Sequence, residues 1–369
     1  LTFCRTESQE SLTGDAALTA AVAALRTGKI VAAKGIGGYH LLCDARDDAA
    51  VGTLRERKHR PDKPLAVMFP TAGDDGLDRV REAVVPTEAE AHAMISDLRP
   101  IVLVRRRQRD GLSPFVAPGL NELGVFLPYS PMHQLVLDAF GAPLVATSGN
   151  LSGEPVLTEN VEAQARLASI ADAFLHHTRP IQRPADDSVL RTTRDRPRPL
   201  RLGRGAAPLE LTLSAELARP LLAVGGQMKG AIAIAWKNRA VISPHIGEMD
   251  TPRSLKVFEA TVHDLQSLYG IRAEHVVADA HAGYTTHRWA QSSGLPVTKV
   301  AHHHAHASAL AGEHAIDTPM IVFTWDGTGM GTDGTLWGGE TLVGQPGQWQ
   351  RVASLRPFRL PGGERAGRE

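Results

Sequence analysis

Three basic side chains, Lys58, Arg60 and Lys63, lie within six residues of one another in the first half of the chain. Pro61 and Pro64 restrict the backbone around them. Such closely spaced cations suit a polyphosphate ligand, because a guanidinium group grips phosphate oxygens in pairs and an ammonium group offsets the charge of departing pyrophosphate. A basic run on a solvated surface has the same spacing. The spacing alone therefore leaves a nucleotide site and a plain surface both open.

Small polar residues follow an apolar segment at 144–147, which we expect to be a β-strand. Ser148, Asn150 and Ser152 would then lie at the carboxyl edge of a sheet, where α/β proteins bind ligands. An ordinary loop of turn-forming residues is the alternative. The acidic pair at 186–187 is either a wall of the same site or a charged turn, and the local sequence favours the turn.

A histidine-rich run at 301–306 precedes a segment of good helix formers. On a helix, His302 and His306 are four residues apart, so both imidazoles project from one face, as a divalent metal requires. Asp326 follows the apolar segment 321–325 and offers an oxygen ligand. A solvent-exposed histidine-rich turn is the alternative interpretation.

Glycines gather in two places in the second half of the chain. Four of the eight residues after Asp326 are glycine, and Gly327 and Gly329 are candidates for a loop that presents backbone N–H groups to an anion. The turn at 225–226, which runs on to Lys229, is a second phosphate-loop candidate. A plain glycine hairpin or β-turn would have the same composition.

Length and composition limit the possible classes of protein. At roughly 150 residues per domain, 369 residues suggest two or three domains. With 40 basic and 40 acidic residues, a broad basic face for nucleic acid is not favoured. Two cysteines cannot make a disulfide framework, which fits the cytoplasm. No apolar run is long enough to span a membrane, and no signal-peptide pattern opens the chain.

Helical and strand-like segments alternate, which predicts α/β architecture in both halves. An arginine- and proline-rich stretch at 192–208 lacks periodicity, and a new strand pattern begins at 221. We therefore expect a first domain over 15–208, a linker over 209–220 and a second domain over 221–369. Residues 1–14 would be the remnant of a preceding region. Because the chain starts at Leu1 and stops without a completed element, we expect it to be a fragment.

The first half resembles the YrdC-like domain of the HypF family, the carbamoyltransferases of [NiFe]-hydrogenase maturation. The motifs that carry this resemblance are Lys34–Asp44, Arg57–Met68, Leu123–His133 and Thr147–Pro155. The resemblance implies a twisted open sheet whose positive concave surface binds ATP with Mg²⁺. Lys58, Arg60 and Lys63 would grip phosphates and the acyl-adenylate, and the polar residues that would bind substrate or nucleotide are Ser148, Asn150, Ser152, Lys34 and Arg204.

The second half is similar to the start of the carbamoyl-transfer domain of the same family, which belongs to the actin/sugar-kinase-like (ASKHA) α/β superfamily. The matching motifs are Val224–Lys229, Ser243–Glu248, His302–His306 and Asp326–Glu340. The resemblance implies one divalent metal, iron or zinc, held by His302, His306 and Asp326. Nucleotide contacts would come from Lys229, Gly327 and Gly329, and the domain would be incomplete at the chain end.

The function implied by the resemblance has two steps. ATP and carbamate, derived from carbamoyl phosphate, would form carbamoyl-adenylate, and the carbamoyl group would pass to the C-terminal cysteine of the partner protein HypE. An O-carbamoyltransferase or a threonylcarbamoyl-adenylate synthase would share the same basic and polar motifs. A YrdC-like module that binds RNA without catalysis is a further alternative, which zero net charge and few aromatic residues disfavour.

Overall fold

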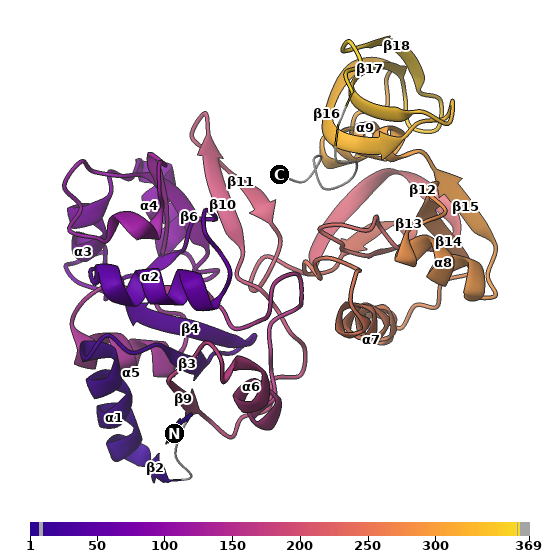
Figure 1. Ribbon diagram of the computed structural model, residues 1–369. Coiled ribbons are helices and arrows are strands. Elements are labelled where there is room, and N and C mark those ends of the chain that lie inside the picture. The colour runs from indigo at the N-terminus through magenta and orange to yellow at the C-terminus, as the bar shows by residue number, and fades with distance from the viewer. Residues whose placement is uncertain (7–9, 360, 362–369) are drawn as a thin grey trace. The chain divides into compact units, whose positions relative to one another are not determined.

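The protein was analysed as a computed structural model, which describes residues 1–6, 10–359 and 361. It divides into two compact units, Leu1–Ala207 and Pro208–Glu369 (Figure 1). Each unit has its own sheet and its own hydrophobic core, as two separate α/β patterns predict.

An eleven-stranded mixed sheet forms the centre of the first unit, in the order β11-β10-β6-β7-β5-β8-β4-β3-β9-β1-β2. Its strands are β1 (Thr2–Arg5), β2 (Ser11–Thr13), β3 (Val31–Lys34), β4 (Tyr39–Asp44), β5 (Val67–Met68), β6 (Ile101–Arg105), β7 (Glu122–Phe126), β8 (Leu144–Ser148), β9 (Ala173–His176), β10 (Val189–Thr193) and β11 (Arg196–Arg201). The helices are α1 (Gly14–Arg26), α2 (Asp48–Arg57), α3 (Asp78–Ala83), α4 (Glu88–Ile95), α5 (Pro131–Phe140) and α6 (Asn160–Leu167), with a 3₁₀ turn at Pro114–Val116.

The middle strands of this sheet are buried on both faces. Along β4, Tyr39, Leu41 and Cys43 face one core and Leu42 faces the other. Helices α1 and α5 pack on the second of these cores, and α2, α3, α4 and α6 pack on the first. Coverage of this second face is incomplete, since Ile101 and Leu103 of β6 are only partly buried, and the face stays open beside the end of β8 at Ser148.

Two segments differ from the sequence prediction. Residues 2–5, expected to be a remnant of a preceding region, form β1, which pairs with β9 inside the first sheet. Residues 209–220, expected to be a linker, belong to strand β12 (Leu209–Ala223). Its first half alternates partly buried leucines with exposed polar residues, which is the period of a strand. The sequence prediction missed this alternation because the preceding arginine- and proline-rich stretch has no periodicity.

Two smaller sheets build the second unit (Figure 1). The first has the order β13-β12-β14-β15, and the second has the order β16-β17-β18. The remaining elements are β13 (Ala233–Ile242), α7 (Pro252–Tyr269), β14 (His275–Asp279), α8 (Thr285–Ser292), β15 (Val297–Val300), α9 (His302–Glu313), β16 (Met320–Met330), β17 (Leu336–Gly344) and β18 (Gln350–Ser354). The candidate site of this unit is formed by the end of β14, the middle of β16 and the start of α9.

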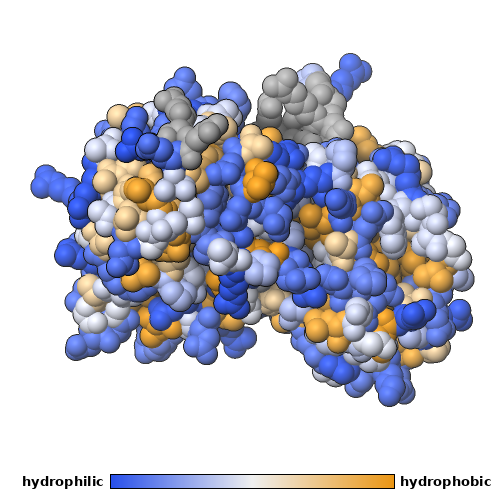
Figure 2. All heavy atoms as spheres, turned by 90° about the horizontal axis from the view of Figure 1, so that it is seen from below, coloured by the Kyte–Doolittle hydropathy of each residue, from blue (hydrophilic) through white to orange (hydrophobic). Residues whose placement is uncertain are grey.

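In the part of the chain that the structure describes, no helix has the length and apolar character needed to cross a bilayer. Figure 2 shows one face of the molecule, on which polar side chains predominate and apolar side chains gather only in small groups.

Candidate functional site

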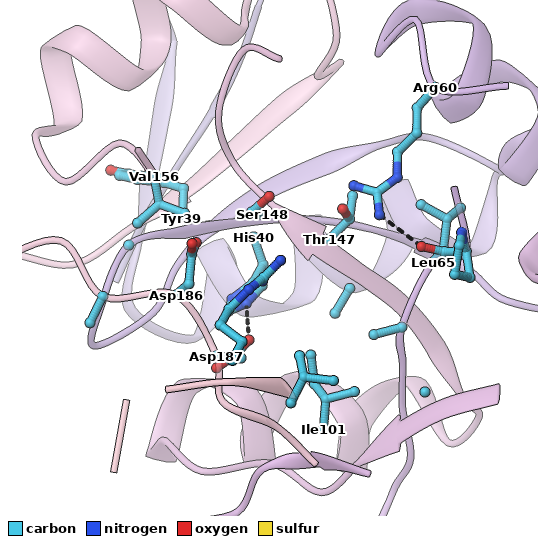
Figure 3. Close-up of a pocket in the computed structure, with 18 of the residues that line it drawn as sticks. Tyr39, His40, Arg60, Leu65, Ile101, Thr147, Ser148, Val156, Asp186 and Asp187 are labelled. Carbon is cyan, nitrogen blue, oxygen red and sulfur yellow. Dashed lines mark hydrogen bonds and ion pairs between the residues drawn. The ribbon is translucent and has the colours of Figure 1, made fainter. Parts of the chain in front are cut away.

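A pocket of about 280 Å³ lies on one face of the sheet of the first unit, beside the start of β4 and the end of β8 (Figure 3). Its apolar part comes mainly from strands β6 and β8 and from the segment that leads into β5. Its polar part combines basic, acidic and hydroxyl side chains. The polar and charged residues that line it are Tyr39, His40, Arg60, Thr147, Ser148, Asp186, Asp187 and Arg201. A cavity with an apolar floor and a few polar groups suits a nucleotide-sized ligand.

Lys58 holds the loop that follows β8. Its ammonium donates to the carbonyl oxygen of Ser148 at 2.6 Å, and to the backbone and side-chain oxygens of Asn150 at 3.0 and 2.9 Å. The Ser148 hydroxyl donates to the same Asn150 side-chain oxygen at 2.8 Å. Between them Gly149 has no room for a side chain, since a Cβ would lie 2.6 Å from that of Tyr39. The loop is therefore fixed in one shape with Ser148 at the pocket wall.

Arg55, a residue that sequence reasoning missed, fixes the basic loop itself. One nitrogen of its guanidinium donates to the backbone oxygens of Arg60, Pro61 and Lys63 at 2.8, 2.8 and 3.1 Å. Its Nε atom donates to the backbone oxygen of Phe115 at 2.5 Å. A buried cation that satisfies several carbonyl groups positions a loop rather than a ligand. Arg55 therefore allows Arg60 to face the pocket.

Burial makes this cationic site electrostatically strained. Desolvation, followed by repulsion from Arg60, lowers the pKa of Lys58 to about 7. Desolvation, followed by the charges of Arg55 and Arg201, lowers the pKa of Arg60 to about 10. An anion that entered the pocket would relieve this repulsion, so the site favours a negatively charged ligand.

Of the residues predicted for this site, only Arg60 and Ser148 line the cavity, and Lys58 and Asn150 are bonded to the loop that carries Ser148. Four other predicted residues are not brought to the pocket. Lys63 and Ser152 are exposed at the surface, and neither lines the cavity. Lys34 is buried and donates to the Asn160 side-chain oxygen at 2.8 Å, which also accepts from the Tyr39 hydroxyl at 2.9 Å. Arg204 is the fourth. These four residues have the amino-acid types that the family motif requires, but the tertiary packing directs their side chains away from the pocket.

Arg204 is a structural cation and not a pocket residue. Its guanidinium donates to the backbone oxygens of Leu98 and Arg99 at 3.0 and 2.8 Å, and Nε lies 3.2 Å from the buried Asp187 carboxylate. The other oxygen of Asp187 pairs with His40 at 2.9 Å. Although burial opposes it, these two partners hold the pKa of Asp187 below its usual range.

Replacing Arg204 by leucine should lower the free energy of unfolding by about 3–5 kcal/mol, because the buried Asp187 charge would lose a partner. Arg201→Ala is the matched control, since Arg201 is exposed and lines the pocket. That variant should change stability by no more than about 0.5 kcal/mol while weakening nucleotide binding. Urea unfolding and nucleotide titration measure the two quantities. Equal destabilisation by both substitutions would contradict the assignment.

Arg201, Asp186 and Asp187 line the pocket although sequence reasoning did not select them. Arg201 lies in the arginine-rich stretch, where nothing local distinguishes it from its neighbours. The acidic pair was interpreted as a charged turn, and it forms the pocket wall instead. The choice between these interpretations depends on which strand the pair precedes, and that strand, β10, joins the sheet beside β6.

In the second unit, His302, His306 and Asp326 come together. One ligand atom from each lies within 4.8 Å of the others. The Nε2 atoms of His302 and His306 are 3.1 and 4.0 Å from Asp326 Oδ2. The two histidines are on the first turns of α9, and Asp326 is in β16, which contacts that helix. The predicted helix spacing is confirmed, and both imidazoles share one face.

Asp279, at the end of β14, positions the first histidine. Its Oδ2 atom lies 2.6 Å from Nδ1 of His302, and its Oδ1 atom accepts from the backbone N–H of His281 at 2.8 Å. The hydrogen bond to Asp279, followed by the close contact with the Asp326 carboxylate, raises the pKa of His302 to about 9. Because Nδ1 is committed to Asp279, the Nε2 atom is directed at the cluster.

The donor set fits a divalent metal. Two imidazole nitrogens are borderline ligands and a carboxylate oxygen is a hard one, and this combination is typical of zinc or iron. Among the described residues, Asp326 Oδ2 is buried and accepts no hydrogen bond of good geometry, although His302 Nε2 is close. A Cβ at Gly329 would lie 2.9 Å from the His302 ring, so the backbone passes directly beside the cluster. An unsatisfied buried carboxylate oxygen beside two imidazoles is the arrangement that a cation completes.

The predicted nucleotide contacts of this unit, Gly327, Gly329 and Lys229, do not form a phosphate-binding loop. Gly327 and Gly329 belong to β16, where the pairing with β17 shifts register between Trp325 and Gly329. Lys229 is exposed, with a positive φ of 50°. Gly329 leaves room for the histidine rings, and the two strands form a bulged hairpin. A glycine hairpin was one of the two interpretations that the sequence left open.

Comparisons with known proteins agree with this division. Residues 23–203 match the family described as "Telomere recombination", which groups Sua5, YciO and YrdC proteins. Residues 216–313 match the "HypF Kae1-like domain", and residues 322–369 match "Carbamoyltransferase, Kae1-like Domain, second subdomain". The fold and sites thus define a class of α/β protein in which a YrdC-like unit precedes a Kae1-like unit.

Similar proteins narrow the class further. "Carbamoyltransferase HypF" of Synechocystis sp. is 43% identical over 367 residues, which are 99% of this chain and 47% of that protein. The HypF protein of Rhodobacter capsulatus is 43% identical over 364 residues, covering 96% and 48%. A crystal structure of full-length HypF in the phosphate- and nucleotide-bound form has a TM-score of 0.92 and 38% identity, covering 99% and 47%. The chain belongs to the HypF family and spans about half the length of these relatives.

Proposed function

We propose that this chain carries out an ATP-dependent carbamoyl transfer in two steps. In the first, a carbamate oxygen attacks the α-phosphorus of ATP, and the bond to the leaving pyrophosphate breaks to give carbamoyl-adenylate. In the second, a thiolate attacks the carbamoyl carbon, and AMP leaves. The acceptor proposed from the family is the C-terminal cysteine of HypE. Carbamate would come from carbamoyl phosphate by hydrolysis, in which water attacks the phosphorus, the bond to the carbamate oxygen breaks, and inorganic phosphate is the other product.

One observation carries the first step: Arg60, Arg201 and Ser148 converge on a pocket whose cations repel one another. The apolar part of the pocket suits the adenine base, and the basic groups suit the phosphates. Lys58 would hold the Ser148 loop in register and offset charge as pyrophosphate departs. Mg²⁺ would accompany the triphosphate, as it does for most ATP-using enzymes.

The second step is proposed for the Kae1-like unit. A divalent metal held by His302, His306 and Asp326 would supply Lewis-acid polarisation and a fixed orientation of the nucleotide. The chain's own contribution is the geometry around it. Asp279 orients His302, and Gly329 of β16 lets the backbone approach the His302 ring.

The test is ATP–pyrophosphate exchange by this chain with Mg²⁺. Carbamoyl phosphate, carbamate, and bicarbonate with threonine are supplied in separate reactions. The expected result is exchange with carbamate or carbamoyl phosphate and none with bicarbonate plus threonine. A Ser148→Ala variant should lose most of the exchange, because it removes a hydroxyl at the pocket wall. Exchange that is undiminished in this variant would place the reaction elsewhere.

Threonylcarbamoyl-adenylate synthesis is the second candidate. The threonylcarbamoyl-AMP synthase of Bacillus subtilis is 30% identical over 172 residues, or 45% of this chain. This likeness covers fewer than half of the residues, whereas the HypF relatives match nearly all of them. Exchange that requires both threonine and bicarbonate would establish this candidate in place of the first.

A further inference from the structure

Asp186 is a carboxylate in the nucleotide pocket for which the reaction above has no use. It lines the cavity next to Asp187, but the two acids differ in their partners. Both oxygens of Asp187 are engaged, by His40 and by Arg204. Among the described residues, the Asp186 side chain makes no hydrogen bond or ion pair. These two are the only carboxylates that line this pocket in the described part of the chain.

Asp186 lies on one side of the cavity, the side of Tyr39 and Ser148. Figure 3 shows Asp186 on the same side as Ser148 and Val156, whereas Leu65 and Ile101 lie toward the other side. Arg60, the phosphate ligand proposed above, also lies on the side of Leu65, so the base and phosphate contacts gather there and Asp186 is on the side left for the acyl group. Burial raises the pKa of Asp186, and the charge of Arg201 acts in the opposite direction. A carboxyl group accepts a hydrogen bond through an oxygen in either protonation state.

The chemistry of a carbamoyl group calls for such an acceptor. Its oxygens are acceptors, which the basic and hydroxyl groups of the pocket can satisfy. Its nitrogen carries two N–H donors, and cations cannot satisfy them. An acetyl group has nearly the same shape but a methyl group in place of NH₂. A buried acceptor that meets a methyl group stays unsatisfied, which makes hydrogen-bonding sites selective.

We propose that Asp186 is the specificity-determining residue for the carbamoyl group, accepting a hydrogen bond from its N–H and rejecting acids that lack one. The inference rests on the proposed adenylate-forming function of this pocket. It gives a role to Asp186, whose position the sequence analysis had interpreted as part of a charged turn.

The experiment measures binding of two inert mimics of the adenylate, so that it does not depend on turnover. Calorimetry compares 5′-O-sulfamoyladenosine carrying a carbamoyl group with the same compound carrying an acetyl group. The wild-type chain should bind the carbamoyl compound about 10–100-fold more tightly. Asp186→Ala should remove this preference by weakening only the carbamoyl compound, and Asp186→Asn, which keeps an acceptor oxygen, should retain part of it. Asp74→Ala, in an exposed turn, is the control and should leave the preference intact.

Three outcomes would overturn the inference. They are an absence of preference in the wild-type chain, a preference that persists in Asp186→Ala, and equal weakening of both compounds. Equal weakening would point to a contact with the ribose or to a folding defect, which thermal unfolding identifies. Failure of the proposed function is a separate result, since it appears as absent pyrophosphate exchange in a chain that still discriminates between the two compounds.

Discussion

Replacing Lys58 by alanine is expected to reduce ATP–pyrophosphate exchange by about 10²–10³-fold, the loss typical when a preorganised charged donor is removed. The structure gives the substitution two effects. It removes a buried cation 2.6 Å from the backbone oxygen of the pocket residue Ser148, and it releases three acceptor atoms of Ser148 and Asn150. A displacement of this loop by about 1 Å would by itself cost on the order of 10²-fold in rate.

The pH dependence of nucleotide binding separates Lys58 from its neighbours. Burial lowers the pKa of this lysine to about 7, well below its ordinary value of 10.5. Between these values Lys58 of the free protein is largely neutral, and it must take up a proton when phosphate binds. Nucleotide affinity should therefore fall by up to about tenfold per pH unit above pH 7, and the Lys58→Ala variant should lack this dependence.

Lys63→Ala is the matched control for this prediction, because it removes the same charge from an exposed position on the same loop. Its exchange rate should stay within a few-fold of that of the wild-type chain. A loss equal to that of Lys58→Ala would mean that net charge, and not the contacts of Lys58 with the 148–150 loop, sets the rate. Pyrophosphate exchange and nucleotide titration from pH 6.5 to 9 provide both readouts.

The sequence was sufficient where a local period or spacing defines the geometry. Helix periodicity alone predicted that His302 and His306 share one face, and the helix begins at His302. The strand at 144–147 placed Ser148 at a sheet edge, and β8 ends at that residue. Both predictions rest on one element, whose geometry a few neighbouring residues determine.

Residue roles that depend on several distant segments could not be predicted. Arg201 and Arg204 are three residues apart and chemically equal, yet one lines the pocket and the other pairs with Asp187. Which of them is buried depends on segments near residues 98 and 187. Asp279 likewise has no local signal, because its partner His302 is 23 residues away and reaches it only after β14 and α9 are placed.

Substitutions at the His–His–Asp cluster should separate direct ligands from the residue that orients them. His302→Ala removes a nitrogen donor and should abolish stoichiometric binding of Zn²⁺ or Fe²⁺ at micromolar protein concentration. Asp279→Asn leaves all three donors in place but changes the partner of His302 Nδ1. A change of this kind should weaken metal affinity by about 10–100-fold. Competition with a chromogenic chelator measures both affinities without any need for catalysis.

His314→Ala is the control for this series, because His314 is exposed at the end of the same helix, outside the cluster. It should leave metal affinity unchanged. If His314→Ala weakened binding as much as His302→Ala, the metal would be held by the histidine-rich surface and not by the cluster. If Asp279→Asn had no effect, the 2.6 Å contact with His302 would be structural only. We expect metal affinity to be lowest in His302→Ala, intermediate in Asp279→Asn and highest in the wild-type chain. This order follows if the Nε2 atom of His302 binds the metal while a carboxylate holds its Nδ1 atom.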